Sequence, residues 1–258
     1  MTSETSATSR RRQTIWIVLP AYNEETDLPL LLDRIEDSMV EADLLYHIVI
    51  VDDGSTDRTL DIAREAASRM PIHIELHETN LGLGATIRDG LVTACGLADP
   101  RDILVTLDAD NSHTPELVLR MVRQIREGHD VVIASRYRSG SHVKGVPFLR
   151  RVLSWWGGLL FKAVFPIKGV RDYTSGYRAY RAELIQSVVS GTDRPFFDQD
   201  GFQVMVDILL KLRRVPDLIF GEVPMILRYD LKSGASKMDV GATIGNTLRL
   251  MVRRRLEG

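Results

Sequence analysis

Short apolar runs alternate with amphipathic stretches along the first half of the chain. The runs lie at residues 15–19, 47–51, 72–76, 103–107 and 131–134. Between them, residues 25–40, 58–69, 85–95 and 115–126 carry apolar side chains at helical spacing. This alternation predicts an α/β fold, in which a mostly parallel sheet is flanked by helices on both faces.

The pattern changes after about residue 135. A loop at 138–147 precedes an apolar, aromatic segment at 148–165 with helical character, and a polar loop follows. We then predict a helix at 199–213, a strand at 218–223 and a helix from about residue 239. These features predict one domain over residues 14–238.

The two ends of the chain differ from this domain. Residues 1–13 are rich in Ser and Thr, end in three arginines and a glutamine, and lack the apolar core of a signal peptide, so we interpret them as a disordered tail. Residues 239–258 are predicted to form an amphipathic helix, ending in a run of arginines. It could lie on a membrane surface, dock a membrane subunit, or pack on the core.

Composition narrows the class of protein. The chain has 258 residues, a net charge of −2 and 26% charged residues, which is ordinary for a globular protein and does not favour a nucleic-acid partner. Its one cysteine, Cys95, cannot form an internal disulfide and is interpreted as a small buried apolar residue. Because no uncharged apolar run reaches 18 residues, we expect no spanning helix.

Acidic residues follow two of the predicted strands where each strand ends. Asp52 and Asp53 come after the second run, and Asp108 and Asp110 after the fourth. Because ligands of such sheets bind at the carboxyl ends of strands, these carboxylates can meet one ligand. The first pair can accept hydrogen bonds from a base or ribose. Asp57, in the same loop, is interpreted as a cap of the next helix.

Asp108 and Asp110 stand at positions i and i+2 after a strand, so they can share a divalent ion. Oxygen ligands suit Mg²⁺ or Mn²⁺, which bridge substrate phosphates and neutralise charge on a diphosphate leaving group. Gly82 and Gly84 do not form a dinucleotide fingerprint, because Ile87 replaces the third glycine and the preceding strand is the third.

Four motifs together, at residues 20–24, 52–57, 80–84 and 108–110, resemble the signature set of the family 2, GT-A fold glycosyltransferases. The resemblance covers roughly the first 135 residues. It implies a donor site in which one acid of the Asp52 and Asp53 pair contacts the nucleotide and Asp108 and Asp110 hold the metal and diphosphate. The other donor-binding residues that it implies are Pro20, Tyr22, Glu24 and Gly84.

The acceptor end is basic and aromatic. Residues 136–181 contain ten lysines and arginines and one acid, Asp172, together with Trp155, Trp156, Phe161 and Phe165. This composition suits a phosphate headgroup on a hydrocarbon tail at a membrane surface. A buried helix with a solvated basic edge would have the same pattern.

Motifs at residues 135–137, 172–179, 202–203 and 234–237 resemble the polyprenyl-phosphate-mannose synthase branch, which includes the dolichyl-phosphate mannose synthases. The resemblance implies that Arg136, Arg150 and Ser154 hold the acceptor phosphate and that Lys237 closes over the phosphates. With Asp110, Arg136 and Lys237 form the catalytic set. The branch usually has an arginine six residues before the loop lysine; here Leu231 stands there, with Lys232 and Arg228 nearby.

These observations predict an inverting, metal-dependent transfer of a hexose, mannose from GDP-mannose, to a polyprenyl or dolichyl phosphate. The enzyme would be cytoplasmic and peripheral at the inner membrane face. A phosphate acceptor is already anionic, so no strong base is needed. Two alternatives remain open: a family 2 transferase using another donor, such as a UDP-sugar, or a soluble hydroxyl acceptor, and a non-catalytic nucleotide-sugar-binding subunit.

Overall fold

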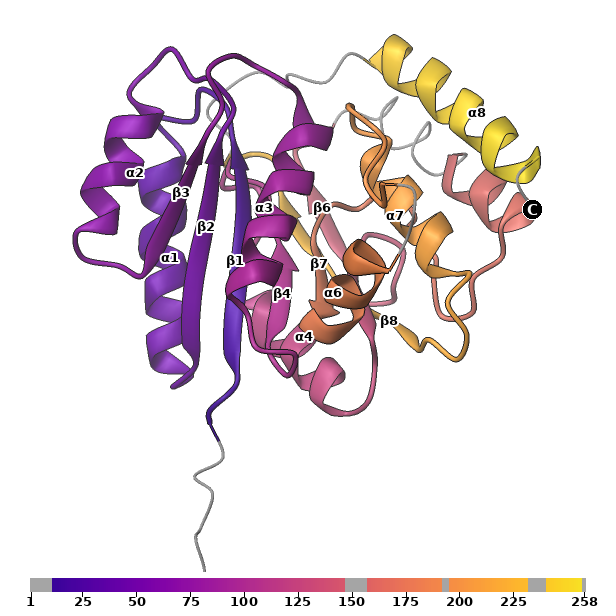
Figure 1. The fold of residues 1–258 in the computed structure, drawn as a ribbon, viewed down its shortest axis with the longest axis horizontal. Coiled ribbons are helices and arrows are strands. Elements are labelled where there is room, and N and C mark those ends of the chain that lie inside the picture. The colour runs from indigo at the N-terminus through magenta and orange to yellow at the C-terminus, as the bar shows by residue number, and fades with distance from the viewer. Residues whose placement is uncertain (1–10, 147–156, 192–194, 232–239, 257–258) are drawn as a thin grey trace, which may run out of the picture.

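The computed structural model describes residues 11–146, 157–191, 195–231 and 240–256. Its centre is a seven-stranded sheet with the order β3-β2-β1-β4-β7-β5-β8 (Figure 1). The strands are β1 (Thr14–Ala21), β2 (Leu45–Asp52), β3 (Ile72–Leu76), β4 (Ile103–Thr106), β5 (Val131–Ser135), β7 (Arg178–Arg181) and β8 (Phe220–Pro224). Only β7 among them runs antiparallel to its neighbours, so the predicted mostly parallel sheet is confirmed.

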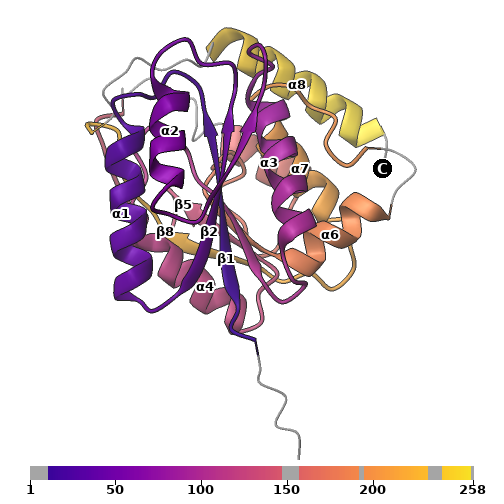
Figure 2. The ribbon, with the colours of Figure 1, turned by 60° about the vertical axis from the view of Figure 1, so that its left-hand side comes forward.

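Helices cover both faces of the sheet, as Figure 2 shows. One face packs against α1 (Leu28–Glu41), α2 (Thr59–Ala67) and α4 (Leu117–Arg126), and the other against α3 (Leu83–Leu97), α6 (Ala182–Ser190) and α7 (Val204–Leu212). Alternate residues of β1 divide between the two cores: Ile15 and Ile17 face the first, Trp16 and Val18 the second. Both sides are therefore buried, which explains why the strands appear as continuous apolar runs.

The second half differs from the sequence prediction at several places. The short strands β6 (His142–Lys144), inside the predicted loop at 138–147, and β9 (Ile226–Arg228) were not predicted. The predicted helix at 199–213 begins only at Val204, because residues 199–203 form a loop whose backbone packs on the first turn of α3. The strand β7, with the helix α6 after it, was not predicted. Arginines at both ends of β7 hide the apolar pattern, and Arg178 is buried because backbone carbonyls of Met205 and Tyr173 accept its hydrogen bonds.

A second, small sheet pairs β6 (His142–Lys144) with β9 (Ile226–Arg228). Of the predicted helical segment at 148–165, residues 157–164 are helical, and residues 147–156 lie outside the described residues. Within the described parts of the chain, every helix is too short or too polar to span a lipid bilayer.

The last helix, α8 (Val240–Leu256), lies beside α7 (Figures 1 and 2). Its inner face buries Leu250, Met251 and Arg254. Its outer face exposes Leu248, Val252 and Leu256, among basic side chains. The helix is thus amphipathic in place, with one face on the core and one toward solvent.

Cys95 on α3 is partly buried, and burial raises the pKa of its thiol to about 12 from an ordinary 9.0. Because only the thiolate reacts, iodoacetamide at pH 8 is expected to alkylate the native protein about a thousandfold more slowly than an ordinary thiol. Mass spectrometry of samples with and without urea measures this. Equal rates in both samples would contradict the assigned environment.

Candidate functional site

The loops that follow β1 and β2 are hydrogen-bonded to each other. The backbone N–H of Asn23 donates to Ser55 Oγ at 2.9 Å, and Asn23 Oδ1 accepts from the backbone N–H of Thr56 at 2.8 Å. The backbone N–H of Glu24 donates to Thr59 Oγ1 at 2.7 Å. Asn23 has a φ of 51°, a conformation that asparagine tolerates better than most residues. These hydrogen bonds hold the loop after β1, which carries the residues predicted to bind the base and ribose, beside Asp52 and Asp53 at the end of β2.

Asp53 organises the next loop. Its carboxylate accepts hydrogen bonds from the backbone N–H groups of Leu81 and Gly82, each at 2.9 Å, and lies 2.7 Å from His77 Nδ1. The side chain is almost fully buried. Both carboxylate oxygens of Asp53 therefore hold the chain that leads into α3.

Asp52 differs from its neighbour. Its Oδ2 accepts one hydrogen bond from the backbone N–H of Ser55 at 3.3 Å. Its Oδ1 is buried and has no hydrogen-bond partner among the described residues. A buried acceptor without a partner is costly, so Asp52 is the member of the pair better suited to accept a hydrogen bond from a ligand.

Asp57 has a structural role, although the N-cap position of α2, predicted for Asp57, is occupied by Arg58. Its Oδ1 accepts the backbone N–H of Thr59 at 2.9 Å, at the start of α2. Its Oδ2 accepts the backbone N–H of Glu25 at 3.2 Å. The side chain thus joins the loops after β1 and β2.

Gly84 allows a close approach of two backbone segments. Its N–H donates to the carbonyl of Asp200 at 2.8 Å, and a Cβ at this position would lie 1.9 Å from the carbonyl oxygen of Gln199. Only glycine permits this contact without displacing the loop at 199–203. The structure therefore places Gly84 at a packing contact between α3 and that loop, next to the chain held by Asp53.

Gly84→Ala is expected to destabilise the fold by about 1–3 kcal/mol, because the added methyl group must move backbone rather than a flexible side chain. Gly96→Ala is the matched control on the same helix, where a Cβ meets nothing within 4 Å. The control should be neutral or stabilising by up to about 1 kcal/mol. Urea denaturation measures both, and equal shifts would contradict the assigned contact.

The acids after β4 lie at the same edge of the sheet. Asp110 Oδ1 accepts hydrogen bonds from the backbone N–H and the hydroxyl of Ser112, at 3.1 and 2.6 Å. The Asp108 side chain is 43% exposed, and its Oδ2 lies 3.8 Å from His113 Nδ1. Asp110 is thus held in a fixed orientation, while Asp108 faces the solvent side of the edge.

The side chains of Asp108 and Asp110 carry the oxygen ligands that a hard divalent cation prefers. Within the described ranges of the chain, no three His, Cys, Asp or Glu side chains are grouped to hold a metal ion. Asp108 and Asp110 offer carboxylate oxygens, the ligand type that Mg²⁺ and Mn²⁺ take together with water and substrate phosphate oxygens.

Arg136 follows β5 and forms an ion pair with Asp172; the Asp172 side chain is fully buried and that of Arg136 is 23% exposed. Its Nε and Nη2 donate to the Asp172 carboxylate at 2.8 and 2.7 Å, and its backbone N–H donates at 3.0 Å. Burial works against both charges. The paired carboxylate nevertheless raises the pKa of Arg136 above its ordinary value, and Arg136 holds the pKa of Asp172 below its own. Both groups are charged at neutral pH.

Asp172 is itself fastened to the sheet. Glu222 Oε1 on β8 accepts the backbone N–H groups of Arg171 and Asp172, at 2.6 and 2.8 Å. Asp172 also accepts from the backbone of Ser175 at 3.1 Å. Arg136 is therefore held at the sheet edge, where it also feels the charge of Asp108.

The remaining predicted acceptor residues are not all visible. Arg150, Ser154, Lys237 and Lys232 lie outside the described residues. Arg228 is present and donates from Nε and Nη2 to Asp230, at 3.0 and 3.1 Å.

His113, which was not predicted to belong to the site, is buried beside Asp108. Its ring lies 5.1 Å from that of Tyr177, and its Nδ1 has no hydrogen bond within the described part of the chain. The signal available was its position directly after Ser112. A histidine near two carboxylates is too common to be noticed without the fold.

Comparisons with known proteins agree with this geometry. The family model described as glycosyl transferase family 2 matches residues 16–189. Undecaprenyl-phosphate mannosyltransferase of Micrococcus luteus is 34% identical over 93% of this chain and 95% of its own length. Dolichol-phosphate mannosyltransferase of Pyrococcus furiosus is 32% identical over 76% of this chain, which spans only 52% of that relative.

A solved structure supports the fold. Glucosyl-3-phosphoglycerate synthase of Mycobacterium tuberculosis, in complex with Mn²⁺, uridine diphosphate and phosphoglyceric acid, superposes with a TM-score of 0.65 at 25% identity. The match covers 95% of this chain and 78% of that one. The predicted GT-A fold is confirmed, and the chain belongs to the family 2 glycosyltransferases.

Proposed function

We propose that this protein is an inverting hexosyltransferase that moves mannose from GDP-mannose to a polyprenyl or dolichyl phosphate at the cytoplasmic face of a membrane. One observation carries the proposal: Asp108 and the Arg136–Asp172 ion pair share the carboxyl edge of the sheet. Groups suited to a metal diphosphate and to an acceptor phosphate therefore lie close together.

On the donor side, Asp52 would accept a hydrogen bond from the nucleoside through its unpartnered oxygen. Asp108 and Asp110 would hold Mg²⁺ or Mn²⁺. When bound, such an ion neutralises the charge that develops on the leaving diphosphate. Ser112 keeps the Asp110 carboxylate oriented, so little reorganisation of the protein is needed as the diphosphate leaves.

On the acceptor side, Arg136 would orient a phosphate. A guanidinium remains charged, and because Nε and Nη2 donate to Asp172 and Thr174, Nη1 is the nitrogen that would donate to the phosphate. Asp172 holds this side chain in one orientation, which reduces the entropy lost when the acceptor binds. A phosphate oxygen needs no strong base, so alignment behind C1 would carry the rate. A single displacement converts an α-linked donor into a β-linked product.

The names of the relatives support the transferred sugar and the acceptor. Two of them are named for mannosyl transfer to undecaprenyl phosphate and to dolichol phosphate. The solved neighbour was crystallised with uridine diphosphate and phosphoglyceric acid, which makes a UDP-sugar and a soluble acceptor the alternatives to test.

The test offers both donors and both acceptors. Purified protein with Mn²⁺ receives radiolabelled GDP-mannose or UDP-glucose, and either undecaprenyl phosphate in detergent or 3-phosphoglycerate. We expect label from GDP-mannose in the lipid phase, abolished by EDTA. Label from UDP-glucose in the lipid would correct the donor, and label in 3-phosphoglycerate would overturn the lipid acceptor. Nucleotide binding without transfer in every arm would favour a non-catalytic subunit.

Peripheral membrane binding is part of the proposal, and the outer face of α8 supports it. Leu248, Val252 and Leu256 are exposed along this face, and the half-exposed Arg253 lies on the same helix. Apolar and basic side chains on one helix face suit an anionic bilayer surface, with or without a membrane subunit. Replacing the three apolar residues with serine should reduce flotation with anionic vesicles. Unchanged flotation would remove α8 from the membrane-binding surface.

A further inference from the structure

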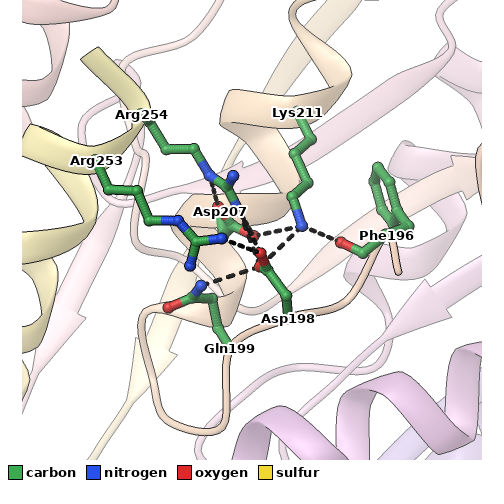
Figure 3. Close-up of polar contacts among 7 residues, drawn as sticks. All are labelled: Phe196, Asp198, Gln199, Asp207, Lys211, Arg253 and Arg254. Carbon is green, nitrogen blue, oxygen red and sulfur yellow. Dashed lines mark hydrogen bonds and ion pairs between the residues drawn. The ribbon is translucent and has the colours of Figure 1, made fainter. Parts of the chain in front are cut away.

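A cluster of charged side chains fastens α8 to the rest of the molecule (Figure 3). Arg254 Nε and Nη2 donate to the Asp207 carboxylate on α7, at 2.6 and 3.0 Å. Arg254 Nη2 also donates to both oxygens of Asp198, at 2.9 and 3.0 Å. One guanidinium therefore joins three segments: the C-terminal helix, α7 and the loop that precedes α7.

Two further cations complete the cluster. Lys211 Nζ lies 2.9 Å from Asp198 Oδ1 and 3.0 Å from Asp207 Oδ2, and it donates to the carbonyl of Phe196. Arg253 Nη2 donates to Asp198 Oδ2 at 3.1 Å, from a half-exposed position. Both carboxylates are thus held by more than one cation, which is required for buried charge.

Burial of the cluster makes these contacts strong. Arg254 is 6% exposed and Asp207 is 1% exposed. Burial by itself would raise the pKa of Asp198, but hydrogen bonds from Gln199 and Lys211 outweigh it and keep that pKa well below its ordinary value. Asp198 is therefore charged at neutral pH. Removing Arg254 would leave two carboxylates with less compensation than they have now.

The loop that Arg254 holds continues directly to the donor site. Two residues after Asp198, the Asp200 carbonyl accepts the N–H of Gly84 at 2.8 Å, in the first turn of α3. A Cβ on Gly82 would lie 2.9 Å from the same carbonyl. The N–H of Gly82 donates to Asp53. Arg254 is thus connected to the donor edge by a short series of direct contacts.

An electrostatic interaction acts between the same two segments. Arg88 on α3 has a raised pKa, chiefly because it donates to Asp89, and the charge of Asp200 adds to this rise. The loop is therefore attracted to α3 as well as hydrogen-bonded to it. If α8 released Asp198, the loop would keep its contacts with α3 and with Lys211 but would lose the contacts that Arg253 and Arg254 make.

We propose that Arg254 is a positioning residue for nucleotide binding: by fastening α8 to Asp198 and Asp207, it keeps the loop at 198–203 seated on the first turn of α3, beside the donor pocket. The inference rests on the proposed donor site, and it does not depend on which sugar or acceptor is used. The C-terminal helix α8 would then support the donor site through its inner face, in addition to the membrane binding proposed for its outer face.

The test compares Arg254→Met with Arg249→Met in the full chain. Arg249 lies on the same helix, is exposed, and donates to Asn246 of that helix at 2.6 Å, so its loss removes the same charge without touching the cluster. The measured quantities are the Kd of GDP and of UDP in the presence of Mn²⁺, by calorimetry. We expect about a tenfold higher Kd for Arg254→Met, within the usual range of coupling between sites, and an unchanged Kd for Arg249→Met.

Rescue and exchange separate positioning from general destabilisation. Arg254→Lys keeps the charge and should recover part of the lost affinity. Hydrogen exchange of the Gly84 amide, which donates to Asp200, should be faster in Arg254→Met and unchanged in Arg249→Met. Should Arg254→Met fail to fold, Asp198→Asn weakens the same attachment from the more exposed loop side, and should raise Kd in the same direction.

Several results would overturn the inference. A folded Arg254→Met protein whose Kd stays within about twofold of the unaltered chain would do so, and so would an equal loss in Arg249→Met, since a factor of two is under 1 kcal/mol. If the unaltered protein bound neither GDP nor UDP, both the donor site and this inference would be wrong. Failure of lipid transfer alone would contradict the proposed acceptor and leave the nucleotide result standing.

Discussion

Asp110→Asn is expected to lower the turnover number by about three orders of magnitude while the protein stays folded, because the variant would lose a charged ligand of the metal ion proposed to bind the leaving diphosphate. The amide can still accept the two hydrogen bonds that Ser112 donates to the carboxylate, so the loop should keep its shape. Initial rates of sugar transfer over a range of Mn²⁺ concentrations measure the effect. The variant should also need more Mn²⁺ for half-maximal rate.

Asp61→Asn is the matched control for charge. Asp61 lies in the first turn of α2, at the surface, and its ion pair with Arg64 is long, at 4.0 Å. It should leave both the rate and the Mn²⁺ requirement unchanged. If Asp110→Asn kept more than about a tenth of the activity at the same Mn²⁺ concentration, the carboxylate would not be a ligand of the catalytic ion.

Asp172→Asn should lower the free energy of unfolding by about 3–5 kcal/mol, the usual loss when one partner of a buried ion pair is removed. The carboxylate is fully buried and holds Arg136 through two side-chain contacts, at 2.8 and 2.7 Å. An amide cannot accept both and would leave the guanidinium without a counter-charge. Urea denaturation at pH 7 measures the loss, with Glu127→Gln as the control, since Glu127 pairs with Arg123 on the exposed side of α4.

The same pair determines a pH dependence. The pKa of Asp172 is lower in the folded protein than its ordinary 3.8. A group with a depressed folded pKa stabilises the fold above its unfolded pKa, and this stability is lost as the pH falls toward the folded value. The stability difference between the native protein and Asp172→Asn should therefore be full at pH 5–8 and shrink below about pH 4. A constant difference down to pH 2 would contradict the assignment.

Much of the fold follows from local pattern. Every predicted strand of the first half is present, and helix boundaries differ by a few residues, since apolar alternation and helical spacing act over short distances. The strand β7 was missed because its place between β4 and β5 depends on residues far away in the chain. Arg178 can be buried there only because Tyr173 and Met205 supply carbonyls, and the strand's own residues do not reveal this.

The candidate site divides in the same way. Acids at the ends of β2 and β4 could be recognised from the sequence, because parallel strands bring their carboxyl ends to one edge. The sequence did not reveal which of Asp52 and Asp53 keeps an oxygen available to accept a hydrogen bond. That depends on the backbone N–H groups of Leu81 and Gly82, in the next loop, which donate to Asp53. The early part of the predicted helix at 199–213 failed for a similar reason. The conformation of residues 199–203 is determined by the hydrogen bond from the Gly84 N–H to the Asp200 carbonyl, and not by the helix propensity of those residues.

By itself, the sequence determined the alternation of strands and helices, the edge of the sheet where a ligand binds, and the chemical types available there, because these depend on neighbours in the chain. The tertiary structure decided which of those groups are already paired. Arg136 meets a carboxylate 36 residues away, and Arg254 meets one 47 residues away. Partners at such separations are chosen by the packing of whole elements, and charge pairs become selective only where that packing excludes water.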